Sequence, residues 1–149
     1  MKKEKVVIAS GYFDPLHVGH VEYLNMAKTL GDTLVVIVNN DEQAKLKKGD
    51  SFMNEKDRLE IVFNLGCVDE VLLSEDKDKS VCKTLELVSQ FKPMAELVFT
   101  KGGDRNFGEV PEVETCERLN IEMIDKLGEK IRSSSDMTGL YERSAIWVT

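Results

Sequence analysis

Apolar residues recur along the chain in two alternating patterns. Short, nearly continuous runs rich in Val, Ile and Leu predict buried strands at 6–9, 33–38, 68–73, 96–100 and 121–124. Apolar residues spaced three and four positions apart predict amphipathic helices at 18–30, between Asn54 and Gly66, between Ser80 and Pro93, and more briefly at 113–119. The polar stretch 39–51 follows neither pattern and is predicted to be a loop.

The alternation of strands and helices predicts one α/β domain spanning residues 1–149. We expect a three-layer α/β/α Rossmann-like fold, in which helices on right-handed crossovers cover both faces of a five-stranded parallel sheet. Ligands of such folds bind beyond the carboxyl ends of the strands, where the strand order reverses. The segment 140–149 carries large apolar side chains and is predicted to cover the core or a partner subunit. The loops expected at the ligand-binding edge are 10–20, 39–53, 74–79, 100–111 and 125–135.

Charge and cysteine content narrow the functional classes. The formal net charge of −7 argues against broad binding to nucleic acid or to anionic membranes, because both need a basic surface. Cys67, Cys82 and Cys116 form no C-x-x-C pair, which predicts free, mostly buried thiols in a reducing compartment. The sequence shows no signal-peptide core and no run long enough to span a membrane. We therefore expect a cytoplasmic protein.

The two histidines of the chain both lie in residues 11–20, GYFDPLHVGH, where the first strand passes into the first helix. His17 and His20 are three residues apart, so both project to the same side of the first helical turn. Free backbone N–H groups and the helix dipole favour an anion at that position. Gly11 is expected to let the backbone approach a ligand, and Gly19 to leave room for a phosphate. The pattern predicts a site for a phosphate chain.

Two other interpretations of the histidines remain open. The H-x-x-H spacing could supply two metal ligands with Asp14 as a third, although zinc prefers a more closed set. Alternatively, the two imidazoles only cap the helix. A dinucleotide-binding fold is disfavoured, because no G-x-G-x-x-G follows the first strand.

Residues 11–20 resemble the G-x-F-D-x-x-H-x-G-H signature of the cytidylyltransferase-like nucleotidyltransferases. Similar segments follow in the family's order, so the resemblance covers about residues 5–136: LGDTLVVIVNND, NEKDRLEIV, VDEVLL and IRSSS. It implies a HUP-type nucleotidyltransferase fold and attack of a substrate phosphate oxygen on the α-phosphorus of a nucleoside triphosphate, with release of pyrophosphate. Class I aminoacyl-tRNA synthetases share an H-I-G-H motif, but this chain is short and acidic and has no late KMSKS-like loop.

The resemblance also implies which residues form the site. The expected catalytic residues are His17, His20, Lys47 and Lys48, with the choice between the two lysines open. The expected nucleotide-binding residues are Gly11, Tyr12, Phe13, Asp14, Gly19, Gly103, Asp104, Arg132, Ser133, Ser134 and Ser135, of which Arg132 is assigned from its charge alone. The expected acceptor-binding residues are Lys77, Lys79, Arg58 and Arg105, with a plain surface role equally open for Lys77 and Lys79.

The resemblance further implies Mg²⁺ that arrives with the triphosphate, without a dedicated protein metal site. CTP is slightly favoured over ATP, and the acceptor is expected to be a small phosphorylated polyol, sugar or related compound. An ATP-dependent activity like that of a heptose-1-phosphate adenylyltransferase is the nearest alternative. We expect a homodimer that makes building blocks for a cell-surface polysaccharide and binds neither nucleic acid nor membranes. Two other classes remain open: a non-catalytic nucleotide-binding regulator, and a metal-dependent hydrolase or redox protein.

Overall fold

The computed structural model describes residues 3–101 and 111–124 of the protein. Strands and helices alternate along them almost throughout. In chain order they are β1 (Lys5–Gly11), α1 (Val18–Lys28), β2 (Thr33–Val38), α2 (Asp41–Lys48), α3 (Glu55–Phe63), β3 (Glu70–Leu73), α4 (Cys82–Phe91), β4 (Glu96–Thr100), α5 (Glu112–Leu119) and β5 (Glu122–Ile124).

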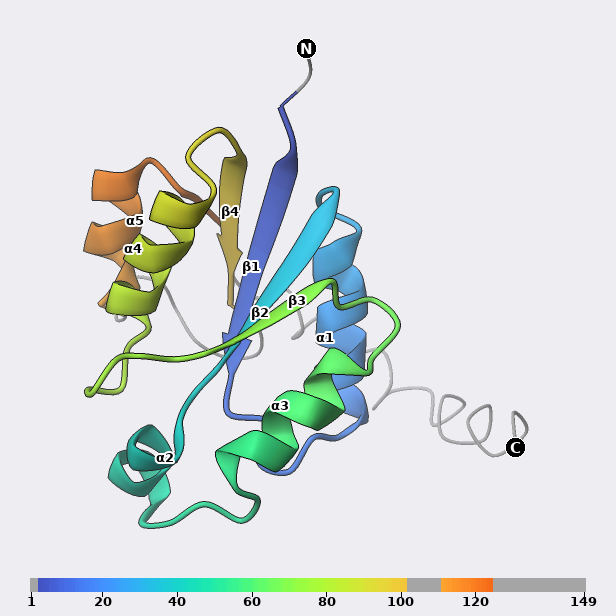
Figure 1. Cartoon of the computed structure of the whole chain (residues 1–149), viewed down its shortest axis with the longest axis vertical. Helices are drawn as coiled ribbons and strands as arrows, with labels where there is room; N and C mark the ends of the chain where they lie inside the picture. Colours follow the sequence, from blue (N-terminus) through green and yellow to red (C-terminus); the bar gives the residue numbers. More distant parts are fainter. Residues whose placement is uncertain (1–2, 102–110, 125–149) are drawn as a thin grey trace, which may run out of the picture.

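The strands form one parallel sheet in the order β3-β2-β1-β4-β5. Figure 1 shows α1 and α3 on one face of this sheet and α4 and α5 on the other. The predicted three-layer α/β/α fold with a five-stranded parallel sheet is confirmed. Because the chain first builds outward from β1 to β3 and then returns to place β4 on the other side of β1, the strand order reverses between β1 and β4. Their carboxyl ends mark the position at which such folds bind ligands.

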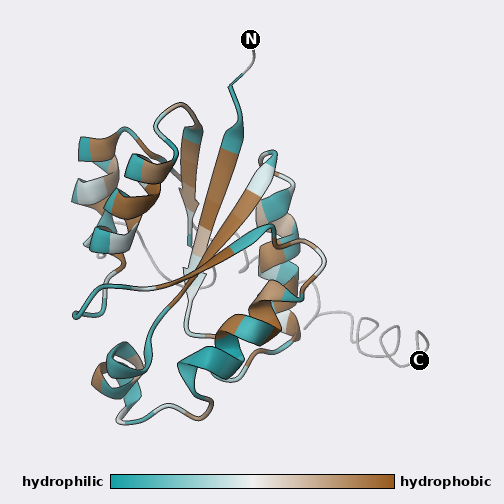
Figure 2. Ribbon diagram, viewed as in Figure 1, coloured by the Kyte–Doolittle hydropathy of each residue, from teal (hydrophilic) through white to brown (hydrophobic). Residues whose placement is uncertain are grey.

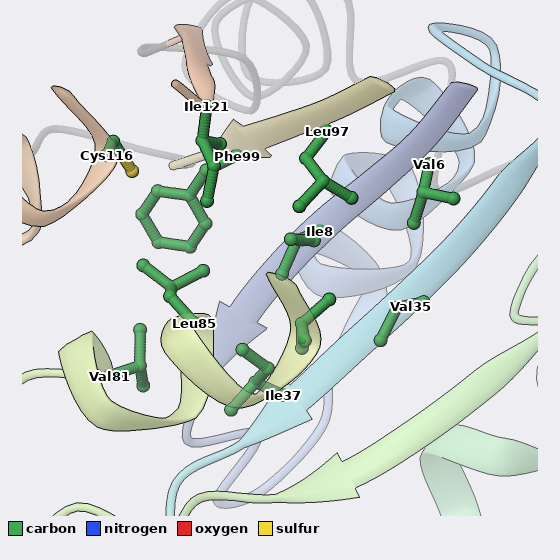
Figure 3. Close-up of a cluster of buried hydrophobic side chains, with 11 residues drawn as sticks. Val6, Ile8, Val35, Ile37, Val81, Leu85, Leu97, Phe99, Cys116 and Ile121 are labelled. Atoms are coloured by element: carbon green, nitrogen blue, oxygen red, sulfur yellow. The ribbon is translucent and has the colours of Figure 1, made fainter. Parts of the chain in front are cut away.

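Successive side chains of β1 point to opposite faces of the sheet and pack into two separate hydrophobic cores. Val6 and Ile8 pack with residues of α4 and α5 in the cluster that Figure 3 shows, whereas Val7 and Ala9 pack with residues of α1 and α3. All four side chains are fully buried. A strand that is covered on both faces needs no polar positions, which explains the continuous apolar runs of the sequence and the hydrophobic central strands in Figure 2.

Helix α2 lies in the stretch that was predicted to be a loop, so that prediction was wrong. The Asn40 side chain accepts a hydrogen bond from the Gln43 backbone N–H, and the Gln43 side chain accepts one from the Asn40 backbone N–H. This reciprocal capping box starts the helix. Only Gln43 and Ala44 of the helix are buried, and Figures 1 and 2 show α2 as a largely hydrophilic helix beyond the end of β2. Local caps stabilise this helix, and its sequence has no apolar period from which the helix could be predicted.

Other predictions at this level are partly confirmed. The predicted amphipathic helix α4 buries Leu85 and Val88, whereas α3 buries Arg58 and Val62 and leaves Phe63 53% exposed. The three cysteines are free, and Cys116 is buried. None of the helices within the described ranges is long and apolar enough to cross a membrane. The IRSSS segment and the segment 140–149 lie outside the described residues.

Candidate active site

The first turn of α1 holds both histidines through their Nδ1 atoms. The Gly19 backbone N–H donates to Nδ1 of His17 at 3.1 Å, and the His17 backbone N–H donates to Nδ1 of His20 at 3.1 Å. A ring nitrogen that accepts a hydrogen bond carries no hydrogen, so each neutral imidazole carries its hydrogen on Nε2. The rings are stacked with centroids 3.8 Å apart. The start of α1 therefore carries two Nε2–H donors side by side.

The two histidines do cap the helix, because His17 is the N-cap of α1 and His20 completes the capping box; that they only cap it stays an open alternative. This role does not compete with ligand binding. Capping uses only Nδ1, His17 is exposed and His20 is half-buried. A single pair of side chains can therefore start the helix and donate hydrogen bonds outward from it.

Gly11, Phe13 and Gly19 have neighbours within the protein that the sequence did not predict, and their contacts with a nucleotide stay predictions. A Cβ atom on Gly19 would lie 2.9 Å from Cε1 of His17, and one on Gly11 would lie 2.9 Å from Cζ of Phe13. The space beside each glycine is thus filled by a ring of the protein, and not held open for a ligand. Phe13 is itself buried in the core and meets the His20 ring edge-on at 5.2 Å. Gly19 therefore packs against His17, Phe13 packs against His20, and Gly11 packs against Phe13.

The amino end of α1 differs electrostatically from the other described helices. Its first turn contains no acidic residue, whereas α2, α3 and α5 each carry two. The start of α4 has none in its own first turn, but carboxylates from elsewhere bind its amides. Within the described part of the chain, α1 is thus the helix whose first turn has no acidic residue and whose Gly19 amide is bound by a histidine rather than by a carboxylate. An anion is therefore best accommodated there.

Helix α2 brings both candidate lysines to the loop that precedes α1. Nζ of Lys48 lies 2.7 Å from Oδ2 of Asp14 and donates to the Asp14 carbonyl at 2.8 Å. Nζ of Lys47 lies over the Tyr12 ring, 4.4 Å from its centroid. The histidine turn and the lysine end of α2 are thus joined through Tyr12 and Asp14, although they lie far apart in the sequence.

Asp14 organises this loop, and the structure does not support a direct contact with the nucleotide. Its fully buried carboxylate accepts hydrogen bonds from the backbone N–H groups of Phe52 and Met53 as well as pairing with Lys48. Burial has the largest single influence on the pKa of Asp14 and acts to raise it, but the bonds from Lys48, Phe52 and Met53 together outweigh it and lower the pKa. The carboxylate stays ionised and ties the loop before α1 to the loop after α2.

The structure does not support the predicted acceptor-binding role of Arg58 either. Its side chain is fully buried, and its guanidinium donates to the carbonyls of Tyr12, Asn39 and Met53 and to Oδ1 of Asp41. A guanidinium engaged in this way inside the protein is not available to a ligand. Arg58 instead joins the ends of β1 and β2 to α2 and α3.

Tyr23 links α1 to β4, which lies next to β1 in the sheet. Its hydroxyl donates to the Thr100 carbonyl at 2.9 Å and lies 3.0 Å from Oγ1 of Thr100, at the carboxyl end of β4. Burial raises the pKa of Tyr23 to about 12, so the phenol keeps its proton. The histidine turn is thereby held at the reversal of strand order between β1 and β4.

Residues 8–136 match the family described as cytidylyltransferase-like. The chain belongs to this family. The bifunctional protein HldE of Hydrogenovibrio crunogenus is 45% identical over 69% of the chain, and the FAD synthase of Thermococcus sibiricus is 38% identical over 80% of it. The matched region spans 20% of that HldE but 78% of that FAD synthase. The resemblance to nucleotidyltransferases drawn from the motifs is confirmed.

A solved structure agrees with this assignment. The lipopolysaccharide core biosynthesis protein of Thermoplasma volcanium superposes with a TM-score of 0.66 at 26% sequence identity, and the match covers 83% of this chain and 96% of that protein. The fold and the family motif therefore identify the start of α1 as the candidate active site of a cytidylyltransferase-like protein.

The loop between β3 and α4 carries Lys77 and Lys79 at the same edge of the sheet. Both lysines are exposed. The first amides of α4 are already bound: Val81 donates to Glu112, Cys82 to Ser80, and Lys83 and Thr84 to Asp76. Three side chains, Glu112, Ser80 and Asp76, thus bind the amides of this helix start, which is closed to a phosphate. Contact of Lys77 and Lys79 with an acceptor stays a prediction.

The described residues contain no cluster of three or more His, Cys, Asp or Glu side chains that could hold a metal ion. The two histidines use Nδ1 on backbone amides, and Asp14 is committed to Lys48 and two amides. The structure therefore does not support a protein-bound metal at H-x-x-H.

The rest of the predicted site lies outside the described residues: Gly103, Asp104, Arg105, Arg132, Ser133, Ser134 and Ser135. Conversely, sequence reasoning missed the residues that position the site, above all Asn40, Asp41, Gln43 and Tyr23. The Asn40 to Gln43 spacing is a capping-box signal that would have revealed α2. The Tyr23 to Thr100 contact joins residues 77 positions apart, and no local pattern reports it.

Proposed function

We propose that the protein transfers a nucleoside monophosphate from a nucleoside triphosphate to a small phosphorylated acceptor and releases pyrophosphate. The observation that carries this proposal is the pair of Nε2–H donors at the start of α1, whose first turn has no acidic residue, beside the lysine end of α2. Family membership supports the same reaction class.

In the proposed reaction an acceptor phosphate oxygen forms a bond to the α-phosphorus, and the bond from that phosphorus to the bridging oxygen of the β-phosphate breaks. The phosphate is already an anionic nucleophile, so the site needs no general base. His17 and His20 donate hydrogen bonds to the phosphate oxygens on which charge builds up, and one such preorganised donor is typically worth about 3–4 kcal/mol. Lys47 and Lys48 neutralise the triphosphate and orient it.

Mg²⁺ bound to the triphosphate would neutralise part of the charge on the leaving pyrophosphate. The protein's share of the work is to hold the phosphates in line and to supply fixed donors. Both tasks suit a helix start whose two imidazole rings are stacked on each other and held by backbone hydrogen bonds to Nδ1.

ATP is the donor that we propose. FAD contains an adenylyl group, so an FAD synthase that is 38% identical over most of this chain supports transfer of AMP. The structural relative is named as a lipopolysaccharide core biosynthesis protein, and this name and the HldE match support a phosphorylated sugar as the acceptor. We propose a cytoplasmic homodimer that supplies activated sugars for a cell-surface polysaccharide.

Pyrophosphate release in the presence of ATP, CTP, GTP or UTP and a panel of sugar, polyol and flavin phosphates tests the proposal. We expect release that requires both substrates and Mg²⁺ and that is fastest with ATP and a sugar phosphate. Triphosphate binding without release, for every acceptor in the panel, would instead indicate a regulator that binds nucleotide without catalysis.

His17→Ala tests the assigned role of the donor pair. The turnover number should fall by two to three orders of magnitude, while the dissociation constant for ATP rises far less, because the donor acts mainly on charge that develops during transfer. Equal losses in binding and in turnover would contradict this role.

A further inference from the structure

Arg58 is the largest fully buried side chain of the described residues, and it is a charged one. Burying a guanidinium costs several kcal/mol unless it is fully hydrogen-bonded, and an apolar side chain of similar volume often stabilises a core as well or better. The requirement for an arginine at this position therefore calls for a reason other than filling space.

The partners of Arg58 supply that reason, because they belong to segments that carry the candidate site. Nη1 donates to the carbonyl of Tyr12, in the loop before the histidine turn, at 2.8 Å, and to that of Asn39, at the end of β2, at 2.6 Å. Nε donates to the Met53 carbonyl at 2.9 Å. Nη2 pairs with Oδ1 of Asp41, in the first turn of α2, at 2.7 Å.

These contacts form two arms. One arm reaches the loop that contains Tyr12 and Asp14 and leads into the histidines. The other reaches Asp41 and thereby α2, whose far end bears Lys47 and Lys48. A planar guanidinium with five N–H donors can bind carbonyls on one side and a carboxylate on the other, whereas a lysine ammonium concentrates its donors at one point.

We propose that Arg58 is a positioning residue that sets the distance between the histidine turn and the lysine end of α2. This inference rests on the proposed function, and it goes beyond it by assigning the alignment of the two halves of the site to one residue that contacts neither half's phosphate-binding groups. A misplacement of about 1 Å can slow transfer by about a hundredfold, so the alignment matters for the rate.

Arg58→Lys tests both arms, and Asp41→Asn tests the α2 arm alone. The Asp41 side chain is 30% exposed, so its amide variant keeps the fold even where the lysine variant does not. We expect kcat/KM to fall about ten- to a hundredfold in Arg58→Lys and about three- to tenfold in Asp41→Asn, at temperatures well below each melting midpoint.

Arg118→Lys is the matched control, because Arg118 forms an exposed pair with Glu86 at 3.2 Å. The kcat/KM of this control variant should stay within twofold of the wild-type value.

A double-mutant cycle separates positioning from general stability. If Asp41 acts through the lysines, Asp41→Asn should raise the dissociation constant for ATP in the wild-type and His17→Ala backgrounds but change it less than twofold once Lys47 and Lys48 are both replaced by Ala. A merely structural role would produce the same cost in all three backgrounds, and that result would overturn the inference.

The ATP dissociation constant also distinguishes failure of this inference from failure of the proposed function. A wild-type protein that binds ATP but transfers AMP to no acceptor overturns the proposed function, while the cycle still decides the role of Arg58. Normal wild-type turnover with equal costs in every background overturns the role of Arg58 alone. A wild-type protein that binds no triphosphate overturns both.

Discussion

At the scale of single residues, His17 and His20 each divide two tasks between two ring nitrogens. Nδ1 accepts a backbone N–H and fixes the ring, and Nε2 keeps the hydrogen that a phosphate oxygen would accept. The same bond that caps α1 thereby determines the tautomer needed for catalysis. A helix cap and a catalytic donor are one feature here, because the ring is bifunctional and its orientation is set by the backbone.

Gly19→Ala should separate stability from activity. Alanine favours a helix over glycine by about 1 kcal/mol, but its Cβ would lie 2.9 Å from Cε1 of His17 and push the ring away. We expect a melting temperature that changes little and a turnover number at least tenfold lower. Gly66→Ala is the control, since nothing lies within 4 Å of its Cβ position, and it should leave turnover unchanged.

Asp14→Asn should produce a loss of stability that depends on pH. The pKa of Asp14 is lowered from 3.8 in the folded protein, so the carboxylate stabilises the fold above about pH 3.8, and this contribution disappears as the pH falls through the lowered pKa. Hydrogen bonds to a buried charge predict a cost of about 2 kcal/mol at neutral pH. Urea titrations should show the gap between variant and wild type closing below pH 3.8, and a gap that stays constant would contradict the assignment. Asp50→Asn, in the loop after α2 that Asp14 binds but itself exposed, serves as the control.

At the scale of elements, α2 shows how a helix can be placed without a hydrophobic face. Its start is stabilised by the capping box of Asn40 and Gln43 and by the ion pair between Asp41 and Arg58. The side-chain amide of Gln43 also donates hydrogen bonds to the carbonyls of Asp78 and Ser80. At its end, Lys48 forms an ion pair with Asp14. Polar contacts are directional, so they place the lysines more specifically than an apolar stripe would.

Lys47→Met and Lys48→Met should differ in stability although both weaken ATP binding. Loss of Lys48 leaves the buried Asp14 carboxylate without its cation, which we expect to cost about 1 kcal/mol after allowance for the partial exposure of the lysine. Lys47 lies over the Tyr12 ring on an exposed helix, and its loss should cost less than half as much. Chemical denaturation measures the difference, and equal destabilisation would contradict the contacts described for Lys48.

Tyr23→Phe tests the link between α1 and β4. The variant loses one buried hydroxyl and leaves the Thr100 carbonyl without that donor, so unfolding free energy should fall by about 1–3 kcal/mol. Thr100→Val removes the partner hydroxyl. The two changes together should cost less than the sum of the single changes, and strict additivity would mean that the two groups do not interact.

At the scale of the whole molecule, every candidate group of the described site lies at the carboxyl edge of the sheet. The arrangement follows from parallel strands with β1 at the centre: the loop after β1 carries the histidines, and the chain after β2 carries the lysines. Among the described residues, the opposite edge contains connections such as 64–69 and 92–95. Nucleotide binding should therefore affect one edge of the sheet.

Hydrogen exchange in the presence of ATP and Mg²⁺ tests whether the nucleotide binds at the carboxyl edge of the sheet. Amides in 12–20 and 41–53 should exchange more slowly with the nucleotide, because the phosphates order both segments. Amides in 64–69 and 92–95 should be unaffected. Protection that is strongest at the latter segments would place the nucleotide at the wrong edge and contradict the site.

The sequence by itself determined the layer architecture, because strands covered on both faces must be apolar throughout and helices must bury one face. It also determined the histidine turn, because H-x-G-H is a local pattern in which capping, spacing and chemistry coincide. Only the tertiary structure decided what Arg58, Asp14 and Tyr23 do. Each acts on backbone or side-chain groups from segments far along the chain, and polar contacts between distant segments leave no period in the sequence from which they could be predicted.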